Sequence, residues 1–298
     1  MPPALPPPEP SHSYYLAYRS VDRPIARLAA GLAGVIVLGL AGAAAVTGLR
    51  QAVVGDPVAA SPEPPAQFLF GNLQFGAILA AAVATSWLVY RQGFGRLSSV
   101  AGRLRWGWLA LASGLAVLPF LAFNAAQYVL DPTTTVAHWR DHSALIVTLV
   151  VTTVPLQAAA EEYVTRGLLG RMVAAAVPSA RAGLVTSCLV TSLAFAALHG
   201  YTSPTLLAYQ FAWAAMAWWI THRTGGLEAA IAAHCANNVM TYLTVPWSDL
   251  TASPLNDGRT TGWDWAVLAA TALVFWLTDR LAARLRGRPP GHGRSALS

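Results

Sequence analysis

The sequence predicts an all-α fold, a polytopic bundle of about eight helices that cross a membrane. Of the 298 residues, 55% are hydrophobic and only 11% are charged, whereas soluble domains are about 25% charged. Apolar stretches long enough to span a bilayer recur along nearly the whole chain. All 19 basic residues are arginines scattered between these stretches, which indicates loops beside a lipid bilayer rather than nucleic-acid binding, so no nucleic-acid partner is expected.

Composition divides the chain into four regions. Residues 1–23 are rich in proline and then polar, which predicts a disordered cytoplasmic tail. Residues 24–140 contain the N-terminal transmembrane helices, and residues 141–246 form a central region that contains the motifs described below. Residues 247–298 contain the last transmembrane helix and an arginine-rich cytoplasmic tail.

The predicted spans are apolar runs bounded by charged residues, glycine or proline. The first run follows the charged residues and is long enough to span, so it does not resemble a cleaved signal peptide. Pro119 is expected to kink the third span. The predicted spans are residues 28–49, 68–90, 106–130, a fourth that ends near 176, 182–200, 205–221, 226–245 and 263–278.

The fourth span contains two adjacent glutamates. Hydropathy alone would end its helix at Ala160, just before them. Residues 163–177 remain largely apolar, however, and Pro178 is the first strong helix breaker after them. The helix is therefore expected to continue to about Ala176, which places Glu161 roughly 22 Å from that end at a rise of 1.5 Å per residue.

Three ionisable side chains lie close together in this span: Glu161, Glu162 and Arg166. An ionised group at the bilayer centre costs about 2.5–3.5 kcal/mol on insertion scales, so such groups are paired or functional. Glu162 and Arg166 stand at i and i+4 and can neutralise each other. Glu161 is rotated about 100° from Glu162 and is free to face another group.

Later spans supply that group. His199 lies near the end of the fifth span, and His234 and Asn238 share one face of the seventh at i and i+4. Helix tilt can bring all of them to the depth of Glu161. A carboxylate and a histidine can activate water while a second histidine and a carboxamide donate to an oxyanion. Alternatively, the same residues can hold a metal ion that lowers the pKa of bound water.

The patterns EExxxR, FxxxH and HxxxN, in this order on separate membrane helices, resemble the CPBP family of CAAX proteases and bacteriocin-processing enzymes, also called Abi or type II CAAX prenyl protease-like proteins. The resemblance covers about residues 145–245 and makes region 141–246 a CPBP-like catalytic core. It implies an intramembrane endopeptidase with an all-helical fold. By the family pattern, Glu161 and His199 activate water, His234 and Asn238 stabilise the oxyanion, and Glu162 and Arg166 support them.

The resemblance also implies a membrane-embedded or membrane-associated peptide or protein as substrate. The family pattern suggests a prenylated CAAX protein, whereas a bacterial source would favour a bacteriocin leader or a membrane regulator. The alternative is a non-proteolytic membrane protein for bacteriocin immunity or scaffolding that retains the site. Taken alone, Glu162 and Arg166 would be a structural ion pair, and His199 would cap a helix at the membrane boundary.

The expected cofactor is either none or zinc. Glu161, His199 and His234 would give zinc three ligands and one open position. Zinc-binding histidines usually need partners that fix the ring tautomer. Apart from Glu162, the candidates in the sequence are mostly apolar, so direct activation of water without a metal is the favoured expectation. These apolar neighbours are Ala196, Ala197, Ala232 and Ala233.

Arginine placement predicts the topology. With eight spans, 16 of the 19 arginines fall on the side of the termini and only Arg50, Arg140 and Arg259 on the other. Positive residues favour the cytoplasm, so both termini are expected there, in a bacterial plasma membrane. Glu228 is expected near the cytoplasmic surface. The predicted interface anchors are Trp218, Trp219, Trp263 and Trp265.

Overall fold

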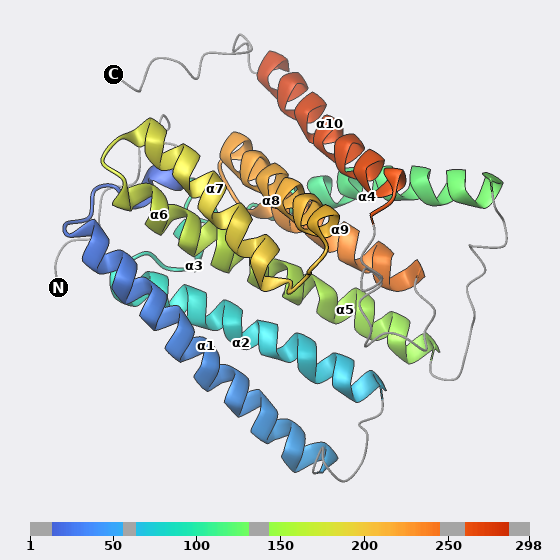
Figure 1. Cartoon of the computed structure of the whole chain (residues 1–298), viewed down its shortest axis with the longest axis horizontal. Helices are drawn as coiled ribbons and strands as arrows, with labels where there is room; N and C mark the ends of the chain where they lie inside the picture. The colour runs from blue at the N-terminus through green and yellow to red at the C-terminus, as the bar shows by residue number, and fades with distance from the viewer. Residues whose placement is uncertain (1–13, 56–63, 131–142, 245–259, 286–298) are drawn as a thin grey trace.

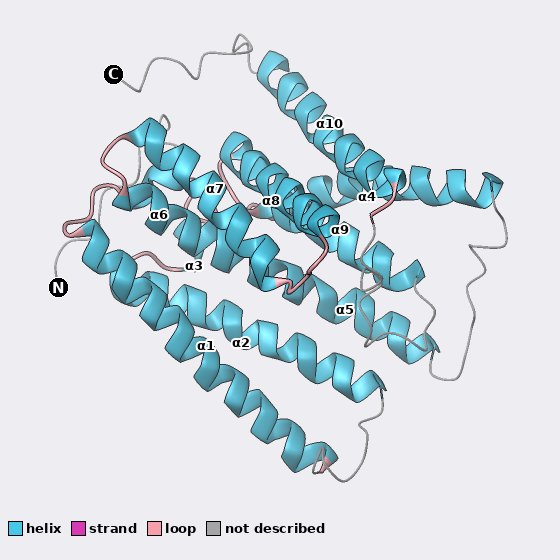
Figure 2. Cartoon of the chain, viewed as in Figure 1, coloured by secondary structure: helices cyan, strands magenta, loops and turns pink. Residues whose placement is uncertain are grey.

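The computed structural model describes residues 14–55, 64–130, 143–244 and 260–285, which fold into helices with no strand among them (Figure 1, Figure 2). The predicted all-α class is confirmed, and a helix lies at each predicted span. The long helices outside the central core are α1 (Pro24–Val54), α2 (Pro64–Tyr90), α4 (Trp106–Leu130) and α10 (Gly262–Leu285). The core contains α5 (Ser143–Glu162), η2 (Tyr163–Leu169), α6 (Gly170–Ala176), α7 (Ala180–Leu198), α8 (Pro204–Thr224) and α9 (Glu228–Thr244).

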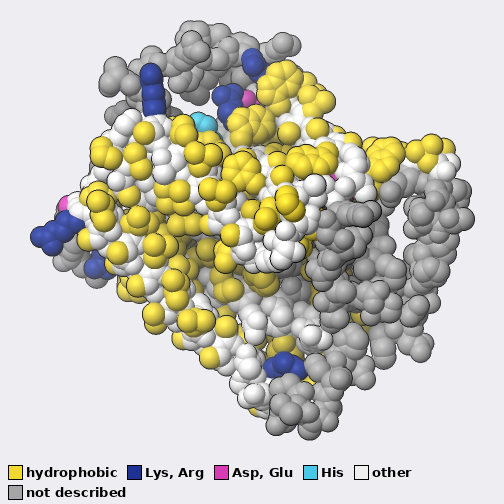
Figure 3. Space-filling view, viewed as in Figure 1, with side chains coloured by type: hydrophobic (Ala, Val, Ile, Leu, Met, Phe, Trp, Pro, Cys, Tyr) yellow, Lys and Arg dark blue, Asp and Glu magenta, His cyan; other side chains and the backbone are white. Residues whose placement is uncertain are grey.

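Several of these helices can cross a membrane. Five segments are long and apolar enough within the described residues, namely 24–54, 65–90, 106–126, 144–176 and 180–198. Apolar side chains dominate the face seen in Figure 3, and Leu40 and Leu193 are 68% and 60% exposed. Such exposure suits contact with lipid. The chain is therefore an integral membrane protein, while the count of eight spans stays a prediction.

One long helical segment forms the centre of the bundle. α5, η2 and α6 follow one another without a break, and η2 is a π-helix. The backbone becomes extended at Val177, directly before Pro178, so the prediction that this helix passes the glutamates and ends near Ala176 is confirmed. α5 packs against α2 and α9, and α6 packs against α7.

A short 3₁₀ helix, η1 (Tyr14–Tyr18), packs against α6, α7 and α8. All three of its tyrosines are fully buried. The ring of Tyr15 stacks on Trp218 with centroids 4.6 Å apart, and the ring of Tyr18 stacks on Tyr90 at 3.9 Å. Aromatic pairs of this kind add to the stabilisation that burial provides.

Two expectations fail at this contact. The predicted disordered tail is wrong for residues 14–18, because three aromatic rings in five positions supply enough apolar surface to pack. Residues 1–13 lie outside the described part of the chain. Trp218, expected at the membrane interface, is only 8% exposed because it packs on Tyr15 and donates from Nε1 to the hydroxyl of Ser187.

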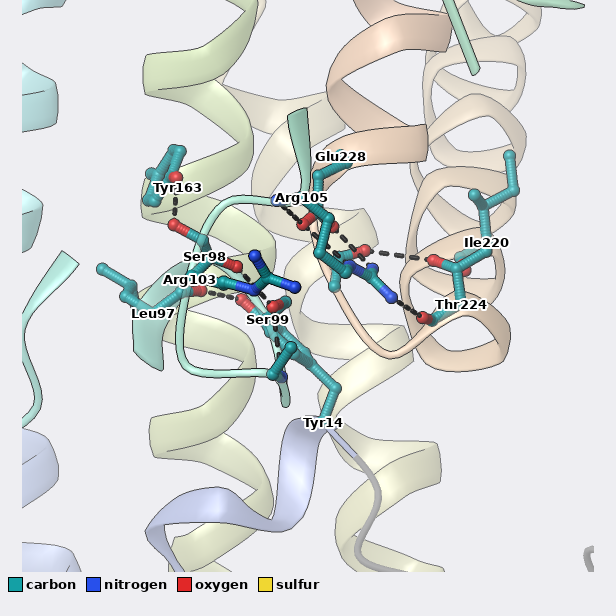
Figure 4. Close-up of polar contacts among 12 residues, drawn as sticks. Tyr14, Leu97, Ser98, Ser99, Arg103, Arg105, Tyr163, Ile220, Thr224 and Glu228 are labelled. Atoms are coloured by element: carbon teal, nitrogen blue, oxygen red, sulfur yellow. Dashed lines mark hydrogen bonds and ion pairs between the residues drawn. The ribbon is translucent and has the colours of Figure 1, made fainter. Parts of the chain in front are cut away.

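The short helix α3 (Phe94–Ser98) and the loop that follows it hydrogen bond to both η2 and α9 of the central core (Figure 4). Arg105 donates from Nε to Oε1 of Glu228 at 2.9 Å and from Nη2 to Oε2 at 2.7 Å. Ser98 hydrogen bonds with the hydroxyl of Tyr163, which directly follows the glutamate pair. Glu228, expected near the cytoplasmic surface, is fully buried, because this loop covers it.

Candidate active site

The two adjacent glutamates have different surroundings. Both end α5, where the helical repeat points their side chains in different directions. The side chain of Glu161 is 17% exposed, whereas that of Glu162 is fully buried. Glu161 is therefore the carboxylate that a bound molecule can reach.

Glu162 forms the predicted ion pair with Arg166. The Nη1 atom of Arg166 lies 3.0 Å from Oε1 of Glu162, and both side chains are fully buried. Arg166 also donates to the main-chain carbonyl of Ala214 in α8, at 3.2 Å, and its guanidinium lies 4.5 Å from the ring centroid of Phe195. Buried charges need this kind of pairing and hydrogen bonding.

His234 lies between the two glutamates. Its Nδ1 atom donates to Oε1 of Glu162 at 2.8 Å, and its Nε2 atom lies 3.7 Å from Oε2 of Glu161. The ring is only 3% exposed. A carboxylate on Nδ1 fixes the orientation of the ring, so Nε2 is the nitrogen presented to Glu161.

His199 immediately follows α7, and its ring is held by its own helix. Its Nδ1 atom lies 2.8 Å from the main-chain carbonyl of Phe195. A carbonyl oxygen only accepts hydrogen bonds, so Nδ1 carries the proton and a neutral ring has its lone pair on Nε2. The ring centroid lies 4.6 Å from that of Phe195, whose ring also lies 5.7 Å from His234. Phe195 therefore contacts both histidine rings.

Asn238 is oriented by its neighbour in α9. Asn237 donates from Nδ2 to the amide oxygen of Asn238 at 3.0 Å. The amide oxygen of Asn238 is therefore engaged, and its amide nitrogen is left as a donor.

Comparison with known proteins identifies this part of the chain. The family model described as type II CAAX prenyl endopeptidase Rce1-like matches residues 143–240. Residues 143–240 are therefore similar to this Rce1-like family. The match contains every residue of the candidate site, and the family implies protease activity. No curated protein and no solved structure matches the chain.

The Rce1-like region brings some predicted site residues together and leaves others apart. Glu161, Glu162, Arg166 and His234 form one connected group. His199 reaches this group only through the ring of Phe195, because no hydrogen bond joins it to a glutamate among the described residues. Asn238 lies one turn after His234 on α9, and Asn237 is its hydrogen-bond partner among described side chains.

Sequence reasoning missed two polar neighbours of Glu161. Gln157 donates from Nε2 to Oε1 of Glu161 at 3.4 Å, and the phenol of Tyr242 lies close to both. Helical spacing could have found them. Gln157 stands at i−4 from Glu161, and Tyr242 stands at i+8 from His234, so each lies on the same helix face as a predicted site residue.

The residues present meet only part of what a zinc site requires. Both histidines have a partner on Nδ1. For His234 it is Glu162, the one polar candidate that the sequence offered. For His199 the partner is a main-chain carbonyl, which side-chain identity does not reveal. No three His, Cys, Asp or Glu side chains gather closely enough for a metal anywhere in the described ranges. Three ligands are therefore not assembled among the described residues.

A cavity borders the face of α9 that carries Asn237. Phe123 and Asn124 of α4, Tyr209 of α8 and Asp264 of α10 also line it. Polar side chains are costly inside a membrane bundle, so their grouping here indicates a polar environment beside Asn237, the residue that orients Asn238.

Proposed function

We propose that the protein is an intramembrane endopeptidase in which Glu161 and His199 activate the attacking water. The observation that carries this proposal is the contrast between the two glutamates. Glu162 is buried and bonded to Arg166 and His234, whereas Glu161 is partly exposed and faces Nε2 of His234. One carboxylate therefore holds the site together, and the other remains available as a base.

The reaction assigns a task to each polar group. Glu161 accepts a proton as the water oxygen bonds to the carbonyl carbon, and it returns the proton to the amine nitrogen as the C–N bond breaks. The lone pair on Nε2 of His199 shares the activation of water. The amide nitrogen of Asn238 donates to the oxyanion, as does Nε2 of His234 when that atom carries a proton.

Zinc remains the alternative within this proposal. Glu161, His199 and His234 are the residues that would hold it, and the ion would supply a bound water of lowered pKa. We favour the direct mechanism because a carboxamide is an uncommon zinc ligand, whereas it suits an oxyanion donor.

The substrate we propose is a peptide or protein segment that enters the bundle from the membrane. We propose a bacterial plasma membrane as the location, and the arginine distribution favours a cytoplasmic position for both termini. Reporter fusions after Gly287 and near Asp257 test this topology, although both positions lie outside the described residues. We expect the former to be cytoplasmic and the latter to lie on the opposite side.

The decisive experiment compares membrane peptides from cells that carry the wild type or Glu161→Gln. We expect cleavage products that depend on the protein to disappear in the variant. Asp279→Asn is the matched control, since it makes the same chemical change at a carboxylate that pairs with Arg223 instead. A biological phenotype that survives Glu161→Gln in a correctly inserted protein would favour the immunity or scaffolding alternative.

A further inference from the structure

Gln157 is a polar residue that neither the family pattern nor the proposed mechanism uses. It lies in α5, one turn before Glu161, within a stretch that is otherwise apolar. Its amide nitrogen donates to Oε1 of Glu161 at 3.4 Å. This bond holds the amide group beside the carboxylate that the mechanism assigns as the base.

The other end of the same amide has no partner. The Oε1 atom of Gln157 is buried, and no donor in the described part of the chain bonds to it. The phenol of Tyr242 is close enough to interact with the Gln157 amide. Even so, Oε1 has no partner at hydrogen-bonding distance and angle among the described residues. Buried polar atoms almost always have a partner, and ordered water supplies it where protein groups do not.

We infer that Gln157 is a water-positioning residue and that its Oε1 atom accepts a hydrogen bond from the water that Glu161 activates. Water has two protons, and only one of them passes to the base. If the second is held by Gln157, a lone pair of the water oxygen is directed away from both groups and toward the substrate carbonyl. This inference rests on the proposed function, because it assigns a place to the same water.

The kinetic test replaces Gln157 with methionine, which has a similar length and no hydrogen-bonding amide. Gln74→Met is the matched control, since Gln74 also lies in a membrane helix and donates its amide to Thr47 at 3.3 Å, away from the site. Both variants are reconstituted in liposomes with a quenched farnesylated peptide that ends in a CAAX motif, and with its unprenylated form.

We expect Gln157→Met to lower kcat by about 10- to 100-fold, as the loss of one hydrogen bond to a reacting group would. KM should change by less than about twofold, because the residue does not bind the peptide. Gln74→Met should keep the wild-type kcat. A Gln157→Met variant that is folded and retains the wild-type kcat would overturn the inference.

The second test needs no activity. An experimental structure of the wild type in lipid, at a resolution that shows ordered waters, should place one within hydrogen-bonding distance of Gln157 Oε1 and a carboxylate oxygen of Glu161. Finding the Tyr242 hydroxyl bonded to Oε1 instead, or no water there, would refute the inference. If the wild type cleaves neither peptide nor any membrane segment, the proposed function fails, while this structural result still decides the role of Gln157.

Discussion

His234 donates from Nδ1 to Oε1 of Glu162 across 2.8 Å, and this bond joins α9 to the end of α5. The same carboxylate oxygen accepts from Arg166. One buried oxygen therefore fixes both the orientation of the histidine ring and the position of the guanidinium.

Replacing Glu162 with glutamine should destabilise the protein strongly. The amide oxygen can still accept from His234, but the guanidinium of Arg166 loses its only carboxylate among the described residues. Breaking a buried ion pair from one side costs about 3–5 kcal/mol. Denaturant unfolding in detergent micelles measures the loss. The double variant Glu162→Gln with Arg166→Met should recover much of it, and equal stability of the single and double variants would contradict the pairing.

Replacing His199 with alanine should affect activity far more than stability. The residue is exposed, and its ring bonds to the main-chain carbonyl of Phe195, one turn earlier in the chain. Loss of a general base lowers kcat by about 10²- to 10⁴-fold. The exposed neighbour Leu198, changed to alanine, serves as the control and should retain activity. Unchanged kcat in the His199 variant would remove it from the mechanism.

Replacing Asn238 with alanine should lower kcat more than replacing Asn237 does. Removing an oxyanion donor, as in Asn238→Ala, lowers kcat by about 10²- to 10³-fold. Asn237→Ala removes only the bond that orients Asn238, so we expect a smaller loss, about tenfold. Asn124→Ala is the control, because Asn124 lines the same cavity but donates to the carbonyl of Phe120. If Asn124→Ala lowered kcat as much as Asn237→Ala does, the effect would come from a change in the cavity and not from the orientation of Asn238.

The pair between Arg105 and Glu228 should stabilise the central core. Glu228 is fully buried and accepts two side-chain bonds and one main-chain bond from Arg105. Glu228→Gln should therefore lower the unfolding free energy by about 3 kcal/mol, which thermal unfolding in micelles would detect as a lower midpoint. Arg27 and Asp22 form an exposed pair, so Asp22→Asn should have almost no effect. A similar shift in both variants would argue against a special role for the buried pair.

Removal of metal should leave the enzyme active. We expect less than one zinc per chain by elemental analysis and retention of peptide cleavage after exhaustive chelation, because the proposed mechanism needs only side chains. One tightly bound zinc per chain, lost together with activity and restored by added zinc, would establish the metalloenzyme instead.

Sequence reasoning succeeded where side-chain identity decides structure. Hydropathy and helix-breaking residues located the helices. The spacing of four residues on one helix face predicted the ion pair of Glu162 and Arg166. It failed where the partner is remote in the chain or belongs to the backbone. Tyr15 packs on Trp218, which lies more than two hundred positions away, and His199 is held by a main-chain carbonyl. Periodicity within one segment contains neither piece of information.

The π-helical segment Tyr163–Leu169 has a consequence for comparing relatives of this protein. In a π turn the hydrogen bonds run from i to i+5, as if one residue had been inserted into an α-helix. Deleting one residue here would allow an unbroken α-helix, and the segments before and after it would keep nearly the same relative orientation, because the wide π turn absorbs the extra residue. Arg171, whose guanidinium lies 3.7 Å from the ring centroid of Tyr14, would then still face that ring. A one-residue alignment gap in this segment is therefore compatible with a relative that keeps the same site.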